Sequence, residues 1–152
     1  MSRNNKMKKH TKKTAKHRKT RKTRTTRTNK MTYEPKIIKP TYVEHVSEPW
    51  FSLIHLGMKT VEGRKNKGRF KDMQVGEIIE WQNDDFKPRT TLTRITHKAT
   101  YPTFKEYLEK EGLDNCLPGI PTLEHGLSVY YKYFTEADEK EYGVVAIRME
   151  KI

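Results

Sequence analysis

The sequence has one cysteine and no long apolar run. Cys116 stands alone, so an intramolecular disulfide and a cluster of cysteine metal ligands are excluded. No stretch approaches the roughly 20 apolar residues that cross a bilayer, and the N-terminus has no hydrophobic segment typical of a secretory signal. We therefore expect an intracellular protein, cytoplasmic or nuclear, that does not contact a membrane.

Several chemical signatures are also missing. The six histidines are scattered, without the spacing of metal ligands. Neither a P-loop nor the G-x-G-x-x-G motif of dinucleotide-binding proteins occurs. The sequence thus predicts no metal site and no cofactor.

Acidic residues are absent from residues 1–30, which contain 14 lysines or arginines. The rest of the chain has 18 basic and 19 acidic residues, so the net charge of +13 arises in this first segment. Almost no apolar residues and no aromatic before Tyr33 are available to offset the entropy of ordering it. Residues 1–36 are predicted to be a disordered basic arm.

The charge of the arm favours phosphate binding without sequence selectivity, because each neutralised phosphate releases counterions. Stretches such as Lys19-Thr20-Arg21-Lys22 are also typical of a nuclear-import signal. A solvated tail that only aids solubility is a third interpretation.

Residues 37–152 have the composition of one modest domain. Strands are predicted at 42–46, 60–64, 77–82, 91–100 and 144–149, the last one central because it is apolar throughout. Helices are predicted at 49–56, 103–111, 122–134 and 136–142, with Ser47 and Thr122 as N-caps of the first and third. This order favours an α+β fold, a small β-barrel of mixed strands with short flanking helices.

The segment Gly57-Met58-Lys59-Thr60-Val61-Glu62-Gly63-Arg64 carries the densest chemistry of the domain. Lys59 can contact a phosphate or polarise a carbonyl. Glu62 and Arg64 lie two apart on a predicted strand and share a face, where a carboxylate can accept from a base amino group and an arginine can bind a phosphate or a base carbonyl. The alternative is an ion pair of purely structural value on the barrel surface.

The spacing Gly57-x-Lys59-x-x-Glu62-x-Arg64 resembles the G-x-K-x-x-E-x-R signature of the ASCH domain family, a branch of the PUA-like superfamily. The flanks agree in order: Pro49-Trp50, the turn Val75-Gly76-Glu77 and the closing strand from Tyr142 to Ile147. The resemblance covers residues 41–152. It implies a pseudo-barrel that binds nucleic acid or a modified nucleobase.

The family also includes ribonuclease-like members and bacterial amidohydrolases that act on acetylcytidine. In those amidohydrolases a threonine nucleophile follows the signature lysine by three positions. Glu62 occupies that place here, and Thr60 does not match it. The resemblance therefore argues against this activity.

Aromatic and basic residues outside the motif extend the candidate site. Trp50, Tyr130 and Tyr133 can stack on a splayed base, although aromatic residues at helical spacing are more often part of a core. Basic residues alternate after the motif, and an extended backbone would place them on one face as a phosphate track; these residues are Lys65, Lys67, Arg69 and Lys71. A solvated face is the alternative.

The favoured hypothesis is a non-catalytic module that binds RNA, or possibly DNA, through the arm and a base pocket at the motif. The alternative is a hydrolase of RNA or modified nucleosides in which Lys59 and Glu62 are catalytic, with Glu111 as a weaker candidate for a second carboxylate. An enzyme is less favoured because no nucleophile occupies the matching position. A third possibility is an adaptor with a basic tail that binds protein.

Overall fold

The computed structural model describes residues 37–85 and 87–152. The prediction of a disordered arm concerns residues 1–36 and lies outside the described part of the chain.

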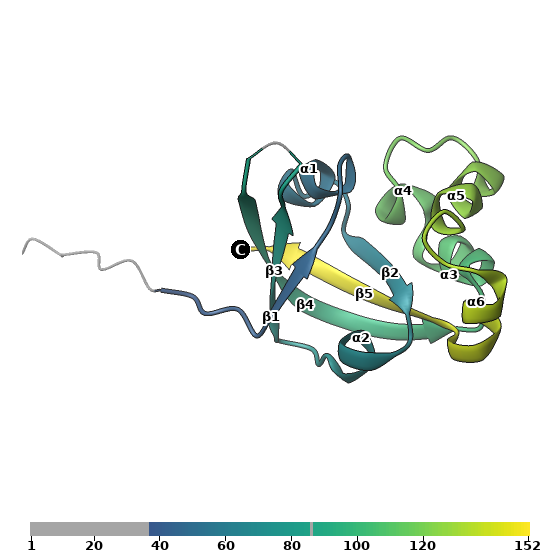
Figure 1. Cartoon of the computed structure of the whole chain (residues 1–152), viewed down its shortest axis with the longest axis horizontal. Coiled ribbons are helices and arrows are strands. Elements are labelled where there is room, and N and C mark those ends of the chain that lie inside the picture. The colour runs from purple at the N-terminus through teal and green to yellow at the C-terminus, as the bar shows by residue number, and fades with distance from the viewer. Residues whose placement is uncertain (1–36, 86) are drawn as a thin grey trace, which may run out of the picture. The chain divides into compact units, whose positions relative to one another are not determined.

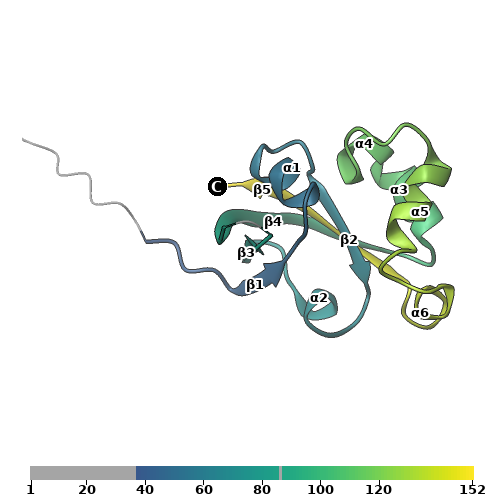
Figure 2. The same cartoon turned by 45° about the horizontal axis from the view of Figure 1, so that its top comes forward.

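Five strands form one mixed sheet in the order β1-β3-β4-β5-β2 (Figure 1). Their bounds are β1 Tyr42–His45, β2 Val61–Lys65, β3 Ile78–Asn83, β4 Arg89–Tyr101 and β5 Val144–Lys151. Strand β1 is parallel to β3, and the other neighbours are antiparallel. The sheet curls into a half-barrel whose two edges are β1 and β2, and we call the gap between them the seam (Figure 2).

Six short helices flank this sheet. They are α1 Trp50–His55, α2 Gly68–Asp72, α3 Phe104–Glu111, α4 Leu113–Cys116, α5 Leu123–Tyr130 and α6 Glu136–Tyr142. Helices α3 to α6 gather on one side of the sheet, and α1 lies apart from them (Figures 1 and 2). The predicted α+β fold is confirmed, with the barrel open at the seam. None of the helices in the described residues is long and apolar enough to cross a membrane.

Helix starts follow local side-chain chemistry. The Thr122 side chain accepts from the His125 N–H at 3.2 Å, which confirms the predicted cap of α5. Ser47 was the wrong cap for α1, because the N-cap is Pro49, without a side-chain hydrogen bond. The carboxylate of Glu48 instead accepts from the Ser52 N–H at 3.2 Å and so satisfies one donor of the first turn.

Two other local predictions were wrong. The basic segment after the motif is extended only as far as Lys67, because Gly68, with φ +56°, starts the short helix α2. The period-two alternation of its lysines and arginines therefore does not apply. The helix predicted at 122–134 ends at Tyr130, and the chain turns so that Phe134 stacks on Phe104, with ring centroids 5.2 Å apart.

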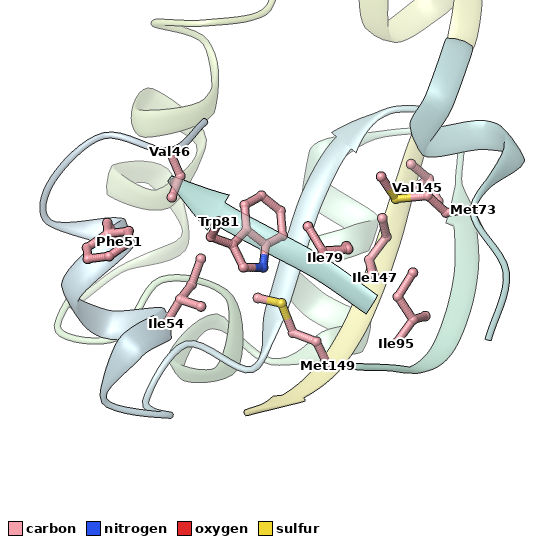
Figure 3. Close-up of a cluster of buried hydrophobic side chains, with 10 residues drawn as sticks. All are labelled: Val46, Phe51, Ile54, Met73, Ile79, Trp81, Ile95, Val145, Ile147 and Met149. Atoms are coloured by element: carbon pink, nitrogen blue, oxygen red, sulfur yellow. The ribbon is translucent and has the colours of Figure 1, made fainter. Parts of the chain in front are cut away.

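Two apolar clusters hold the sheet from its two faces. The first fills the hollow of the half-barrel around Trp81 (Figure 3), whose indole N–H donates to Thr93 at 2.9 Å. The second lies between the sheet and the helices α3 to α5. Strand β5 alternates between them, with Val145 and Ile147 in the first cluster and Val144 in the second, which confirms that this apolar strand is central.

Candidate functional site

The motif begins where α1 ends. Gly57 has φ +73°, a left-handed conformation that suits glycine after the end of a helix. The next two backbone N–H groups, of Met58 and Lys59, donate back to the Leu53 carbonyl at 2.9 and 3.1 Å. This tight turn directs the chain into β2 and fixes the backbone from which Lys59 projects.

The ammonium of Lys59 is buried and fully engaged. Its Nζ donates to the carbonyls of Val61, at 2.9 Å, and Cys116, and it lies 3.1 Å from Glu62 Oε2. An ammonium has three donors, and these three acceptors use all of them. The sequence allows Lys59 to contact a phosphate or a carbonyl of a ligand, but in the structure its charge holds β2 to α4 and to Glu62.

Glu62 is the negative centre of this group. Its side chain is 8% exposed, and its second oxygen accepts from Arg64 Nε at 2.7 Å. Burial by itself raises the pKa of a carboxyl, but the charges and hydrogen bonds of Lys59 and Arg64 outweigh it and hold the pKa of Glu62 below its usual value. Glu62 is therefore ionised at neutral pH.

Arg64 spans the seam. Its Nη2 donates to the His45 carbonyl on β1 at 3.4 Å, while its guanidinium lies 5.1 Å from the centroid of the Phe70 ring and 6.0 Å from that of Trp81. The side chain is 24% exposed. A side chain of one edge strand thus bonds to the backbone of the other where no strand-to-strand ladder exists.

Gly63 offers backbone groups at the same place. The ladder of β2 and β5 includes Met149 N–H to the Thr60 carbonyl at 2.9 Å and Asn66 N–H to the Gly143 carbonyl at 3.1 Å. Antiparallel pairs alternate, so Gly63, opposite Ala146, is a non-hydrogen-bonded position. Its N–H and carbonyl point away from β5, toward the seam.

Gly63 also has a steric role that the sequence did not reveal. A Cβ there would lie 2.7 Å from Cε1 and Cζ of Tyr107. The Tyr107 ring is fully buried, and its hydroxyl lies 3.0 Å from that of Tyr130. The missing side chain therefore lets the wall behind β2 pack closely.

These residues line a cavity of about 520 Å³ at the seam. The polar wall of β2 is formed by Lys59, Glu62, Gly63 and Arg64. The opposite wall comes from the ends of β1 and β3 and the turn after β3, with His45, Asn83, Asp84 and Asp85. The volume lies within the range of small-molecule sites.

Three predicted aromatic residues lie at this cavity: Trp50, Tyr130 and Tyr133. The ring centroid of Trp50 lies 5.7 Å from Nζ of Lys59. Tyr130 is almost fully buried and stacks on Phe104, and its burial together with the nearby Glu62 charge raises its pKa well above the usual value, so its hydroxyl stays protonated. Tyr133 is 60% exposed and forms a wall open to solvent.

The basic residues predicted after the motif lie outside the lining of this cavity. Lys65 pairs with Asp138 at 3.0 Å, and Lys67 donates to the Tyr142 hydroxyl at 2.8 Å. Arg69 pairs with Glu44 at 3.2 Å. Each of the three contacts a polar partner in the domain.

The acidic and amide residues of the β3 wall were not predicted. Asn83 is 1% exposed, and its Nδ2 donates to the Val46 carbonyl at 2.9 Å and to Asp85 Oδ2 at 2.8 Å. Asp84 lies 3.4 Å from His45 Nδ1. In the sequence these residues read as a plain turn, and only the parallel pairing of β1 with β3 brings them to the motif.

A second, smaller cavity of about 380 Å³ holds other groups considered from the sequence. It is lined by Thr60, Glu111 and Arg148, among others, and Arg148 binds Glu111 with Nε to Oε2 at 2.6 Å. The motif threonine and Glu111 thus line a different cavity from Lys59 and Glu62. Among residues 37–85 and 87–152, no group of three or more His, Cys, Asp or Glu is arranged to hold a metal ion.

A half-barrel of mixed strands, with a cavity at its seam lined by polar and aromatic side chains, defines the class of this protein. Comparisons with known proteins define its family. The model of the ASCH domain matches residues 45–152. The chain therefore belongs to the ASCH domain family.

Two solved structures have the same fold. The crystal structure of the hypothetical protein PH0355 is 35% identical, with a TM-score of 0.66, and the match covers 73% of this chain and 98% of that one. The solution structure of protein PF0455 from Pyrococcus furiosus is 34% identical, with a TM-score of 0.60, and the match covers 73% and 96%. No match was found among curated proteins.

Proposed function

We propose that this protein is a module that binds single-stranded RNA and takes one unstacked base into the cavity at the seam. Family membership supports nucleic-acid binding in general. The observation that carries the proposal is the meeting of polar strand groups and aromatic side chains at one cavity of about 520 Å³. Unstacked bases of single-stranded RNA are held by aromatic stacking combined with hydrogen bonds to their edges.

Aromatic and polar groups of the cavity have different roles in binding a base. Trp50, Tyr130 and Tyr133 supply ring surface. The Gly63 backbone offers a donor and an acceptor side by side, a pair that can match the adjacent acceptor and donor on a base edge. Glu62 and Arg64 add an acceptor and donors to the same wall.

Phosphates are proposed to be bound outside the cavity. Lys67 and Arg69 have exposed side chains close in sequence to the motif, and the net positive charge of the chain arises in residues 1–36. Contacts of this kind give affinity without sequence selectivity and weaken as salt rises. Selectivity in this proposal belongs to the cavity alone.

Three features weigh against the hydrolase alternative. The N–H donors of the Lys59 ammonium are all used by Val61, Cys116 and Glu62. The pKa of Glu62 is lowered, which makes it a weak base and a poor acid near pH 7. Thr60 lines the other cavity.

The test is binding of short fluorescent single-stranded RNAs of varied sequence, measured by anisotropy at several salt concentrations. Replacing Tyr133→Leu is expected to reduce affinity about tenfold or more, since one stacked base contributes about 1–3 kcal/mol. Tyr131→Leu is the matched control, because this neighbouring tyrosine does not line the cavity. Equal binding by both variants and the parent would contradict the proposal.

Removing residues 1–36 gives the complementary result. Affinity should fall and the slope of log K against log salt should flatten, while differences between RNA sequences persist. An unchanged affinity and salt slope would refute the role of the arm.

A further inference from the structure

The charge of the cavity lining is not that of a phosphate site. Three carboxylates face it, Glu62, Asp84 and Asp85, against the two cations Lys59 and Arg64. Phosphate sites present an excess of positive charge or free N–H groups. The lining here has an excess of negative charge.

The two cations are also committed to the fold. Lys59 is 3% exposed and held by three acceptors. Arg64 donates through Nε to Glu62 and through Nη2 to the His45 carbonyl. Glu62 offsets one of these two positive charges, and hydrogen bonds within the protein engage both cations.

The two aspartates are placed differently. Asp85 accepts from Asn83 Nδ2 at 2.8 Å and from the Glu48 N–H at 3.0 Å, and the bond from Asn83 is the largest cause of its lowered pKa. Asp84 has a side chain that is 60% exposed and lies 3.4 Å from His45 Nδ1. Asp84 is thus the carboxylate that a ligand entering the cavity can approach.

Aromatic rings complete this environment. Trp50, Tyr130, Tyr133 and Phe134 line the cavity together with the acids. Ring faces attract cations, most strongly those that are weakly hydrated and delocalised. Ring faces beside carboxylates are suited to a flat cation.

On the basis of the proposed function, we propose that the base taken by this cavity is positively charged through methylation of a ring nitrogen. Such a base keeps its flat stacking surface and brings a delocalised charge toward Asp84. Its phosphates stay outside, where Lys67 and Arg69 are exposed. The selectivity is one of charge, and the methyl group matters through the charge that it fixes.

Pairs of isomeric nucleosides test this directly. The probes are 1-methyladenosine and 3-methylcytidine, which bind a proton and are cations near neutral pH, against their isomers N6-methyladenosine and 5-methylcytidine, which stay neutral. Binding to the full chain is measured by calorimetry at one fixed pH near neutrality, the same for every probe. The cationic isomer of each pair should bind about tenfold tighter, equivalent to about 1.4 kcal/mol.

A substitution at the exposed edge of the cavity distinguishes recognition of the ligand's charge from recognition of its shape. Asp84→Asn keeps the size of the side chain at an exposed position and should reduce the preference to about threefold or less, which is about 0.7 kcal/mol. The control Glu109→Gln removes an exposed carboxylate on α3, away from the cavity, and should leave the preference intact. An unchanged preference in the Asp84 variant overturns the inference.

The other outcomes are distinct. If both isomers bind equally and Tyr133→Leu weakens both, the inference fails and the base pocket stands. If no nucleoside binds and Tyr133→Leu leaves RNA binding unchanged, the proposed function fails as well. Binding of a trimethyl-lysine peptide in place of every nucleoside would assign the cavity to a protein ligand and overturn both.

Discussion

Replacing Glu62→Gln tests the central claim about the motif, that one buried carboxylate pairs with two cations and holds the seam in shape. The substitution keeps the volume and planar shape of the side chain and removes its charge. It leaves Lys59 buried with two backbone carbonyls and no counter-ion. It also removes the ionic partner of Arg64 Nε.

Removing one member of a buried ion pair costs about 3–5 kcal/mol, because the remaining charge stays desolvated. The amide oxygen can still accept one hydrogen bond, so we expect a loss near the lower end, about 3 kcal/mol. For a domain of this size the melting temperature should fall by about 10–15 °C. Domains are stable by about 5–15 kcal/mol, so the variant should still fold.

Urea unfolding followed by tryptophan fluorescence measures this loss, since Trp81 is fully buried in the first apolar cluster. The double variant Lys59→Met with Glu62→Gln provides the internal control. The double variant no longer contains the unpaired ammonium. Its loss of unfolding free energy should therefore be about 2 kcal/mol smaller than the sum of the losses of the two single variants. A loss under about 1 kcal/mol in Glu62→Gln, or full additivity in the cycle, would refute the reasoning.

Acid and steric perturbations give two further predictions. The pKa of Glu62 is lower in the folded state, so its contribution to stability is fully present above the unfolded value of about 4.3. The difference in unfolding free energy between the parent and Glu62→Gln should begin to narrow below that pH and close as pH falls through the lower folded value. If urea titrations found the gap constant in acid, the ionised state of Glu62 would be wrong. Gly63→Ala places a Cβ 2.7 Å from the Tyr107 ring and should lower the free energy of unfolding by about 1–3 kcal/mol. In a chain that also carries Tyr107→Leu, the Gly63→Ala substitution should lower it by less. An unchanged melting temperature for Gly63→Ala would contradict the close packing behind β2.

Local patterns predicted most of the secondary structure correctly. The β-branched run at 91–100 forms the long strand β4, and the apolar run at 144–149 forms the central strand β5. Thr122 caps α5 through its own side chain. Such signals act within a few residues, so they can be read without knowing what lies opposite.

The patterns misled at two places, one for a local reason and one because of a long-range contact. The basic run after the motif had the alternation of a strand, but Gly68 turns it into α2, and Arg69 then pairs with Glu44 on β1. The predicted third helix ends early because Phe134 packs on Phe104 of another helix. The basic run is thus ended by a glycine of its own, whereas the helix ends where a partner distant in sequence outweighs the local preference.

The sequence by itself determined the separation of a basic segment from a near-neutral domain, the α+β class and the residues of the motif. These depend on composition and short spacing. The tertiary structure alone decided how the motif is used. It buries Lys59 against two carbonyls and Glu62, sends Thr60 to another cavity, and brings the acidic turn after β3 to face β2. The last of these outcomes depends on the parallel pairing of β1 with β3 across 37 residues of chain, which no local pattern encodes.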